Sequence, residues 1–400
     1  MPPLPPGPPD PRSPFVLAVE ATRLAYDDRG IGRYVRAVLP RLVALRAGLR
    51  LVLFARPGDV AGLAARYAAD PATAGRVDVR PVRELRTARA DLFWYPWNVA
   101  RPAPARGVVV ATVHDVVPVA LPDPRRRRWR RNRRWRRLYA TTAERATLLI
   151  VVSMFTGEEV RRLMGVPPER LRVVLSGADD AALLDANGAA GVEAALARLG
   201  VRRPFVLAVG ASEGRKNLAV LDRAMPQVAA AVPGATLVLA GPRRPGAPPD
   251  PPWKRTLGYV SDADLAALYQ AAGCLALPST YEGFGLPVIE AMRAGTPVVC
   301  ARRASLPEVG GDAALWIEPD DARGIADALT RVLTDDALRA AMRAAGRAQA
   351  ARFTWDETAR RTLAAFDDAV ALGERPAPAT LRAHVAEGIR AVARRLGVTG

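Results

Sequence analysis

Short apolar runs alternate with longer amphipathic stretches along most of the chain. A first series of apolar runs comprises Phe15–Val19, Arg50–Phe54, Asp91–Tyr95, Gly107–Val113, Leu148–Val152 and Leu171–Leu175. Segments of helical periodicity, such as Ile31–Arg46 and Thr156–Met164, lie between most of these runs. Alternation of this kind predicts a parallel sheet covered by helices.

A second series of apolar runs begins after a stretch rich in glycine, alanine and aspartate at Ser176–Arg203. Its members are Phe205–Val209, Ala235–Ala240, Gly258–Val260, Cys274–Leu277, Pro297–Cys300 and Ala314–Ile317. We therefore predict an α/β protein with two doubly wound domains, residues 15–178 and 204–354, joined by a linker at 179–203. Farther on, Leu381, Val385, Ile389, Val392 and Leu396 form an amphipathic stripe that either docks on the protein or touches a membrane.

Composition is that of a globular protein, except for the charge. Half of the 400 residues are hydrophobic and 24% are charged, but the net charge is +18. Such an excess attracts anionic partners. Of the 58 basic residues only Lys216 and Lys254 are lysines. This uniform use of arginine indicates a composition bias and weakens the charge as evidence of function.

Three features bear on the compartment. Cys274 and Cys300 lie singly in apolar runs, which favours a reducing environment. No stretch approaches 18 consecutive apolar residues. Residues 1–14 contain eight prolines and no apolar core, so we expect a disordered leader rather than a signal peptide. These features predict a cytoplasmic protein.

The segment Cys274–Gly295 has the strongest pattern for chemistry. An apolar run ends at Pro278, and a helix is predicted from Pro287 to Gly295. Between them, Gly283 and Gly285 flank Phe284 and allow a ligand to approach the backbone, while the N–H groups near Leu286 face an anion. Glu282 lies in the loop and Glu290 is predicted in the first helical turn. Two carboxylates beside an anion site predict a ligand with phosphates and hydroxyls, a nucleotide sugar. Two solvated glutamates on an ordinary loop are the alternative.

A basic loop follows the first run of the second series. It starts at Gly210 and carries Arg215 and Lys216 immediately before a predicted helix, Leu218–Ala231. Paired basic side chains at such a junction can hold a diphosphate and stabilise it as a leaving group. A solvated basic loop is the alternative.

Two motifs in the first domain lie where open α/β sheets bind ligands. Gly30 and Gly32 open the first helix, although Val35 stands where a dinucleotide fingerprint has its third glycine. His114 follows the valine-rich run at 107–113. From the residues alone, His114 is either a ligand contact or a partner for buried backbone.

The segment Arg125–Arg137 holds ten arginines among thirteen residues, together with Trp129 and Trp135. It is either the solvated face of a connecting helix or a surface for anionic lipid headgroups or a phosphate-bearing acceptor. We expect no nucleic-acid partner, because nothing else in the chain resembles a nucleic-acid module.

These motifs together resemble the retaining glycosyltransferases of family 4. The resemblance rests on Glu282-x7-Glu290, Gly210-x4-Arg215-Lys216-Asn217 and Thr112–Pro118, and it extends over roughly residues 15–370. It implies the GT-B fold, with two Rossmann-like domains facing a cleft and C-terminal helices, residues 355–400, returning to the first domain. It also implies transfer of a sugar from a nucleoside-diphosphate sugar to an acceptor hydroxyl, with retention and without a required metal or cofactor.

The resemblance also implies roles for individual residues. His114 and Glu282 contact the donor sugar, Glu290 holds the ribose, and Arg215 with Lys216 binds the diphosphate. Other residues lining the donor site are Gly30, Gly32, Gly210, Tyr259, Val260, Gly283, Phe284, Gly285 and Leu286. The closest likeness is to bacterial mannosyltransferases, which implies mannose as the sugar and a glycan or lipid-linked acceptor in cell-surface polysaccharide or glycolipid synthesis. Such an enzyme would work at the inner face of the membrane.

Rival classes fail on the same residues. A sugar-nucleotide dehydratase or epimerase needs Tyr-x3-Lys, but Ser212 and Asp250 precede the two lysines at that spacing. A P-loop needs Gly-Lys, which the chain lacks. Asp262-x-Asp264 matches a metal motif only formally, and we interpret it as a capped helix start. A catalytically silent sugar or lipid binder with the same fold stays open.

Overall fold

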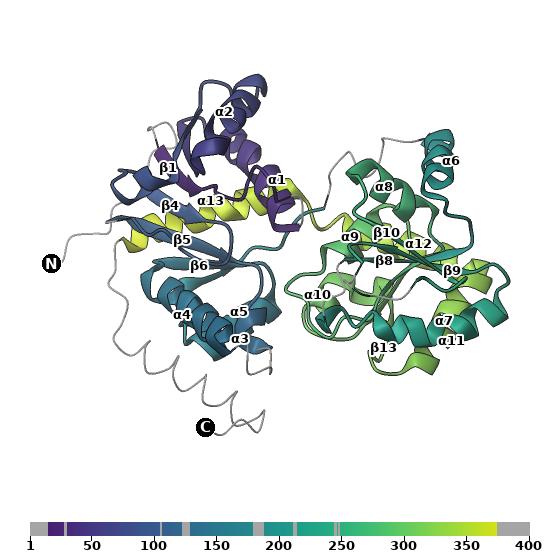
Figure 1. Ribbon diagram of the computed structural model, residues 1–400. Helices are drawn as coiled ribbons and strands as arrows, with labels where there is room; N and C mark the ends of the chain where they lie inside the picture. The colour runs from purple at the N-terminus through teal and green to yellow at the C-terminus, as the bar shows by residue number, and fades with distance from the viewer. Residues whose placement is uncertain are drawn as a thin grey trace. The chain divides into compact units, whose positions relative to one another are not determined.

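The computed structural model describes residues 15–27, 30–104, 106–121, 129–178, 188–210, 214–243, 246 and 249–373 (Figure 1). The chain divides into two compact units. The N-terminal unit comprises residues 1–177 together with 355–400, and the C-terminal unit comprises residues 178–354. The predicted leader at 1–14 and the stripe at 381–396 lie outside the described residues.

The N-terminal unit is built on one seven-stranded sheet with the order β3-β2-β1-β4-β5-β6-β7. All its strand pairs are parallel, as predicted. The strands are β1 (Phe15–Glu20), β2 (Leu49–Ala55), β3 (Val77–Pro81), β4 (Leu92–Tyr95), β5 (Val108–Val113), β6 (Leu148–Val151) and β7 (Leu171–Val173). Only the edge strand β3 was not predicted, because its Val-Asp-Val-Arg-Pro sequence has no apolar run.

Helices cover this sheet. They are α1 (Gly30–Leu45), α2 (Val60–Ala69), α3 (Val117–Ala120), α4 (Trp129–Arg145), α5 (Met154–Met164) and α13 (Trp355–Leu372). Helix α5 begins after Ser153, whose Oγ accepts a hydrogen bond of 2.9 Å from the Thr156 N–H. That bond satisfies one of the free N–H groups of the first turn.

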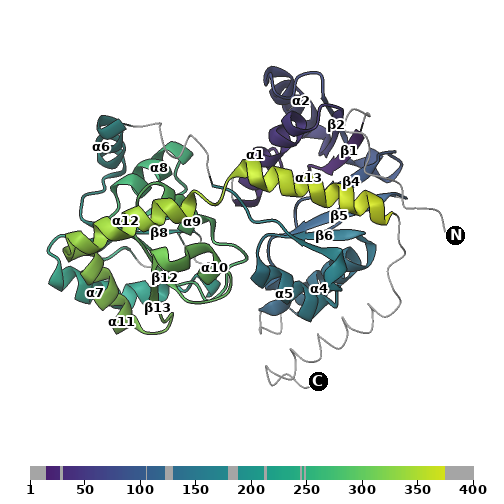
Figure 2. The ribbon, with the colours of Figure 1, turned by 180° about the vertical axis from the view of Figure 1, so that it is seen from behind.

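Helix α13 returns to the N-terminal unit after the chain has completed the other one (Figure 2). It packs along α1. The rings of Trp355 and Tyr34 pack edge to face with their centroids 5.9 Å apart, and the rings of Phe366 and Trp94 do so with centroids 5.5 Å apart. All four side chains are buried. The returning C-terminal helix that the family resemblance implied is therefore present.

The C-terminal unit is built on a six-stranded parallel sheet with the order β10-β9-β8-β11-β12-β13. Its strands are β8 (Phe205–Val209), β9 (Thr236–Ala240), β10 (Lys254–Gly258), β11 (Cys274–Leu277), β12 (Val298–Ala301) and β13 (Ala314–Ile317). The strand predicted at Gly258–Val260 is misplaced, because β10 ends where that run begins. β10 is an edge strand and opens with Lys254 and Arg255, which hid it from a hydrophobicity pattern.

Seven helices of the C-terminal unit are described. They are α6 (Gly188–Leu199), α7 (Ala219–Ala231), α8 (Asp262–Ala271), α9 (Leu286–Arg293), α10 (Leu306–Gly310), α11 (Ala322–Thr334) and α12 (Asp336–Ala350). Helix α6 falls inside the segment predicted as a linker. Cys274 and Cys300 are buried in β11 and β12, and burial raises the pKa of the Cys274 thiol to about 12. No helix in the described part of the chain is long and apolar enough to cross a membrane.

Candidate active site

The loop between β11 and α9 takes its shape from Gly285. This residue has a φ of 107° at the N-cap of α9, a conformation that side chains disfavour. A Cβ on Gly285 would also lie 2.8 Å from Leu306 Cδ2. Pro287 follows in the first turn of the helix, where its missing N–H costs nothing. The predicted strand, loop and helix N-terminus are therefore all present.

Ser305 fixes the other side of this loop. Its Oγ lies 2.9 Å from the carbonyl oxygen of Glu282 and 2.8 Å from that of Phe284. The Phe284 ring packs edge-on against Phe353 at 6.0 Å. Ser305 and Phe284 are both buried. The loop that carries Glu282 is thus held by polar contacts from one side and by apolar packing from the other.

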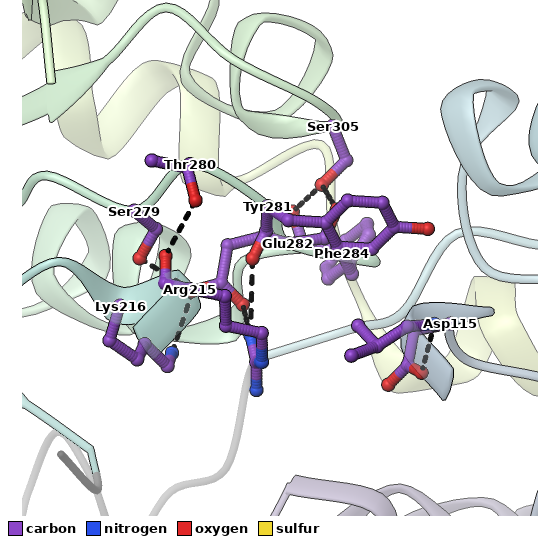
Figure 3. Close-up of polar contacts among 10 residues, drawn as sticks. Asp115, Arg215, Lys216, Ser279, Thr280, Tyr281, Glu282, Phe284 and Ser305 are labelled. Carbon is purple, nitrogen blue, oxygen red and sulfur yellow. Dashed lines mark hydrogen bonds and ion pairs between the residues drawn. The ribbon is translucent and has the colours of Figure 1, made fainter. Parts of the chain in front are cut away.

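The Glu282 carboxylate gathers three partners (Figure 3). Arg215 Nη1 lies 2.9 Å from its Oε2, and Lys216 Nζ lies 2.7 Å from its Oε1. Ser279 Oγ donates a hydrogen bond of 2.8 Å to Oε1. Burial acts to raise the pKa of Glu282, but the charges of Lys216 and Arg215 and these hydrogen bonds hold it below its usual range. Glu282 is therefore an ionised counter-ion for the basic pair.

The basic pair lies in a short 3-10 turn, Gly214–Lys216, between β8 and α7. Strand β8 leads to Gly210, whose φ is 125° and whose N–H bonds to the Ala240 carbonyl at 2.9 Å. The Thr280 N–H donates to the Arg215 carbonyl at 2.8 Å, so the basic turn and the Glu282 loop are also joined through backbone. Residues 211–213 of the predicted motif lie outside the described residues.

Glu290 accepts a hydrogen bond from a residue outside this ion cluster. It is the fifth residue of α9 and thus in the second turn, not the first turn as predicted. Its side chain is buried, and Tyr269 donates a hydrogen bond of 2.8 Å to its Oε2. The sequence pattern began the helix at Pro287, one residue after its observed start at Leu286, so it placed Glu290 in the first turn.

His114 follows β5 in the N-terminal unit, as predicted. Its Nε2 lies 2.8 Å from the Pro96 carbonyl, and its backbone N–H donates to Asn98 Oδ1 at 2.6 Å. A carbonyl only accepts, so Nε2 carries the hydrogen and Nδ1 is left as an acceptor. Burial lowers the pKa of His114 from 6.5 to about 4. The imidazole is therefore neutral at physiological pH.

Of the two glycines at the start of α1, Gly32 has a local structural reason. A Cβ on Gly32 would lie 1.6 Å from the Asp27 carbonyl oxygen, which packs against the helix. The same carbonyl accepts a hydrogen bond of 2.8 Å from Arg36 Nη1. Gly30 is the first residue of α1. Close approach of backbone to backbone thus requires Gly32 whether or not a ligand lies nearby.

The remaining predicted residues lie around β10 and α8. Tyr259 follows β10 and is 78% exposed, and Val260 comes next. Ser261 caps α8 by accepting from the Asp264 N–H, and Asp262 and Asp264 lie in the first turn, which confirms the capping interpretation. Among the described residues, no group of three or more His, Cys, Asp or Glu side chains is placed to hold a metal ion.

Several supporting residues escaped the sequence pattern. Ser279 and Tyr269 bond the two glutamates, Asn98 bonds the His114 backbone, and Glu20 lies buried at the carboxyl end of β1, where burial raises its pKa. Asn98 and Asn217 have positive φ, which asparagine tolerates better than most residues. Asparagines that follow strands are the one local signal that sequence offered for these positions.

The predicted site residues therefore divide into three groups. Arg215, Lys216 and Glu282 form one ion cluster beside the N-terminus of α9. Glu290 lies on the same helix but bonds to Tyr269 instead. His114 belongs to the N-terminal unit and is held by its own loop.

Comparison with known proteins gives one family match in each half of the chain. Residues 29–182 match the family described as Glycosyltransferase Family 4, and residues 197–349 match Glycosyl transferases group 1. O-antigen chain mannosyltransferase B of Escherichia coli is 33% identical over 290 residues, which cover 68% of this chain and 72% of that protein. Serotype-specific mannosyltransferase WbdA of Escherichia coli is 27% identical over 279 residues, covering 64% of this chain but 33% of that protein.

Solved structures share the fold. HepE of Anabaena, crystallised with UDP-glucose, has a TM-score of 0.67 at 18% identity, covering 88% of this chain and 99% of that one. Sucrose-phosphate synthase of Thermosynechococcus elongatus has a TM-score of 0.66 at 24% identity, covering 88% and 98%. The chain is thus a glycosyltransferase with the GT-B fold. It belongs to the family 4 glycosyltransferases, with glycosyl transferases group 1 as its second half, so the family resemblance of the sequence motifs is confirmed.

Proposed function

We propose that this protein is a retaining glycosyltransferase that moves a sugar from a nucleoside diphosphate to an acceptor hydroxyl. One observation carries the proposal: Arg215 and Lys216 converge on the buried carboxylate of Glu282 beside the glycine-opened N-terminus of α9. Two fixed cations and free helix N–H groups are suited to a diphosphate, whose negative charge grows as it departs.

In this proposal the basic pair drives leaving-group departure. The bond between the anomeric carbon and the diphosphate oxygen breaks, and the acceptor oxygen bonds to that carbon on the same face. The acceptor proton passes to the departing phosphate oxygen. Arg215, Lys216 and the N–H groups near Leu286 neutralise the leaving group, so the reaction as proposed requires no metal.

Glu282 has two proposed tasks. It holds the basic pair in place, and it contacts the donor sugar. A carboxylate offers about four hydrogen-bond positions. Arg215, Lys216 and Ser279 occupy three. The fourth suits a sugar hydroxyl, which would donate to the carboxylate.

His114 has a proposed role as a hydroxyl acceptor. Because Nε2 is bonded to the Pro96 carbonyl, the unprotonated Nδ1 is the atom available to a sugar hydroxyl. The depressed pKa keeps that nitrogen an acceptor at neutral pH. The resemblance of Thr112–Pro118 to the family motif supports a contact with the donor sugar.

Other parts of the donor have proposed partners in the C-terminal unit. Glu290 binds the ribose hydroxyls, and the backbone at Tyr259 and Val260 receives the base. Gly210, Gly283 and Phe284 are proposed to line the donor site in that unit, and Gly30 and Gly32 are proposed as further ligand contacts. These assignments rest on the family motifs, and the geometry around Gly285 supports close approach of a ligand to backbone.

The sugar and the acceptor follow from the relatives. Both mannosyltransferases compared above carry mannose in their names, and one is an O-antigen chain enzyme. We infer a mannosyl donor and a glycan or lipid-linked acceptor used in cell-surface polysaccharide synthesis. The proposal includes a cytoplasmic protein that associates with the inner face of the membrane.

A thermal-shift panel tests the donor class. Nucleoside diphosphates and their sugars are added separately, and a rise in melting temperature with one base identifies the donor. Turnover is then measured with that donor with and without a chelator. No stabilisation by any nucleotide would contradict the proposal. Stabilisation without turnover would favour a silent sugar binder, and loss of turnover with chelator would contradict metal independence.

A further inference from the structure

A large cavity of about 840 Å³ lies in the N-terminal unit along helix α4. That volume is in the range of roughly 300–1,000 Å³ typical of small-molecule sites. Its lining is Arg86, Arg101, Pro102, Ala103, Arg130, Arg133, Arg134, Arg137, Leu138, Thr141 and Arg145. Seven of these eleven residues are arginines, and none is acidic.

Helical periodicity creates the first wall. Residues 130, 133, 134, 137, 141 and 145 recur at helical spacing and so share one face of α4. The inward face carries Trp135, Tyr139 and Thr142, and Tyr139 and Thr142 are buried in the core. The arginine face is thus fixed in direction by apolar packing on the opposite side of the same helix.

The second wall is held by two hydrogen bonds, one to α4 and one to β4. The Ala100 N–H donates to Thr142 Oγ1 at 3.0 Å, and Tyr95 OH donates to the Pro102 carbonyl at 2.6 Å. Tyr95 and Thr142 are each 1% exposed. These bonds place the segment containing Arg101, Pro102 and Ala103 beside the helix. The cavity is therefore a built feature of the fold.

The electrostatics of the cavity differ from those of other arginine-rich surfaces in this protein. Arg161 pairs with Glu158, Arg162 with Glu159, and Arg361 with Glu357. In the described part of the chain, no ion pair engages Arg86, Arg101, Arg130, Arg134, Arg137 or Arg145. Composition bias accounts for abundant arginine, but it does not account for a cavity lining in which, among the described residues, these six arginines have no ion pair and no residue is acidic. A polyvalent anion would relieve their mutual repulsion, about 0.5 kcal/mol per pair at about 8 Å in water.

The cavity shares none of its lining residues with the candidate active site. Arg86 and Arg145 lie in segments that lead into the amino ends of β4 and β6. His114 follows the carboxyl end of β5, and the six residues of that strand span about 20 Å. Arg101 lies nearer to His114, because Asn98, three residues before Arg101, accepts a hydrogen bond from the His114 N–H.

We propose that this cavity binds a polyvalent phosphate group, of the pyrophosphate or clustered phosphomonoester class. Guanidinium forks match phosphate oxygens in pairs, and several forks on two fixed walls suit two or more phosphates better than one. The phosphates belong either to a soluble phosphorylated compound or to a lipid headgroup. Both share the chemistry that the cavity recognises.

Calorimetric titration with inorganic pyrophosphate tests the proposal. The parent protein carries Arg215→Ala and Lys216→Ala, so that the other basic cluster does not contribute. Arg101→Gln/Arg134→Gln/Arg137→Gln is compared with a control of equal charge loss at exposed arginines outside the cavity, Arg50→Gln/Arg66→Gln/Arg223→Gln. We expect the dissociation constant to rise at least about 10-fold for the cavity variant at about 150 mM salt, and to change less than about 2-fold for the control.

Equal weakening in both variants, or no binding by the parent, would overturn the proposal. Single reversals Arg134→Glu and Arg66→Glu repeat the comparison if a triple variant fails to fold. Vesicles of phosphatidylcholine with and without about 30% phosphatidylglycerol then separate the sources. If the protein sediments with the anionic vesicles only when the cavity arginines are present, and if pyrophosphate prevents this, the ligand is a lipid headgroup. Vesicle binding equal in cavity and control variants, with pyrophosphate binding still dependent on the cavity, identifies a soluble ligand.

Discussion

Lys216 Nζ lies 2.7 Å from Glu282 Oε1, and both side chains are about nine-tenths buried. The pair joins the turn after β8 to the loop after β11, neighbouring strands of one sheet. Arg215 contacts the other oxygen of the same carboxylate. One acidic side chain thus orients both of the cations that we propose bind the diphosphate.

Replacing Glu282 by glutamine should lower the free energy of unfolding by about 3 kcal/mol, because it leaves two largely buried cations without their counter-ion. Turnover should fall by about 10²-fold, because the basic pair is no longer held in place. Urea denaturation and initial rates measure the two effects.

The matched control for this variant is a double-mutant cycle that combines Glu282→Gln with Lys216→Met and compares the free energies of unfolding. Glu282→Gln should cost at least about 1 kcal/mol less in the Lys216→Met background than in the native chain. Equal costs in both backgrounds would show that the ion pair does not contribute to stability.

His114 should make the folded protein sensitive to mild acid. Burial lowers its folded pKa to about 4, while the unfolded chain protonates near 6.5. Between those values the unfolded state binds more protons, so stability falls as pH falls, by at most about 1.4 kcal/mol per pH unit. Thermal melts of wild type and His114→Gln from neutral pH to pH of about 4 measure this, and the variant should show a shallower decline. Parallel curves would contradict the assignment.

Gly285→Ala should lower the free energy of unfolding more than the same substitution at another glycine with a positive φ. Gly234 has a φ of 79° with open space around its Cβ position, whereas a Cβ on Gly285 meets Leu306. We expect Gly234→Ala to cost about 1 kcal/mol from backbone strain alone and Gly285→Ala about 2–3 kcal/mol. Chemical denaturation measures both. Only Gly285→Ala should also weaken nucleotide binding, and equal binding by the two variants would argue against a ligand at this loop.

Glu290 should favour nucleotides whose ribose carries 2′- and 3′-hydroxyls over nucleotides that lack them. If it binds ribose hydroxyls, Glu290→Gln weakens binding of the preferred nucleoside diphosphate by about 10-fold, since a charged hydrogen bond contributes about 1.5–3 kcal/mol. The 2′,3′-dideoxy analogue should bind both proteins equally. Calorimetry gives the two dissociation constants. Tyr269→Phe removes the hydrogen bond that positions the Glu290 carboxylate. This variant should also weaken binding of the ribonucleotide, and it should leave the dissociation constant of the dideoxy analogue unchanged.

Sequence pattern predicted the buried strands well, because strands covered on both faces are continuous apolar runs. It failed at β3 and β10, which are edge strands with charged residues at alternate or leading positions. Composition also hid α6, whose Gly-Ala-rich sequence reads as a linker until Val192, Ala195 and Leu196 find partners to bury them.

The candidate site divides in the same way. The glycines, the basic pair and Glu282 were evident, because backbone demands and charge leave a local mark. The partners Ser279, Tyr269 and Asn98 were not, because each acts through a residue that only the fold brings near. The direct ion pairing of Glu282 with Lys216 belongs to that second kind, since 66 residues separate them.

Helix α13 has a consequence for biosynthesis. The N-terminal unit needs Trp355 and Phe366 to cover Tyr34 and Trp94, yet those residues leave the ribosome only after the whole of 178–354 has been made. The C-terminal unit is continuous and has all its strands at an earlier moment of translation. The half of the enzyme that is synthesised first is therefore the half that matures last.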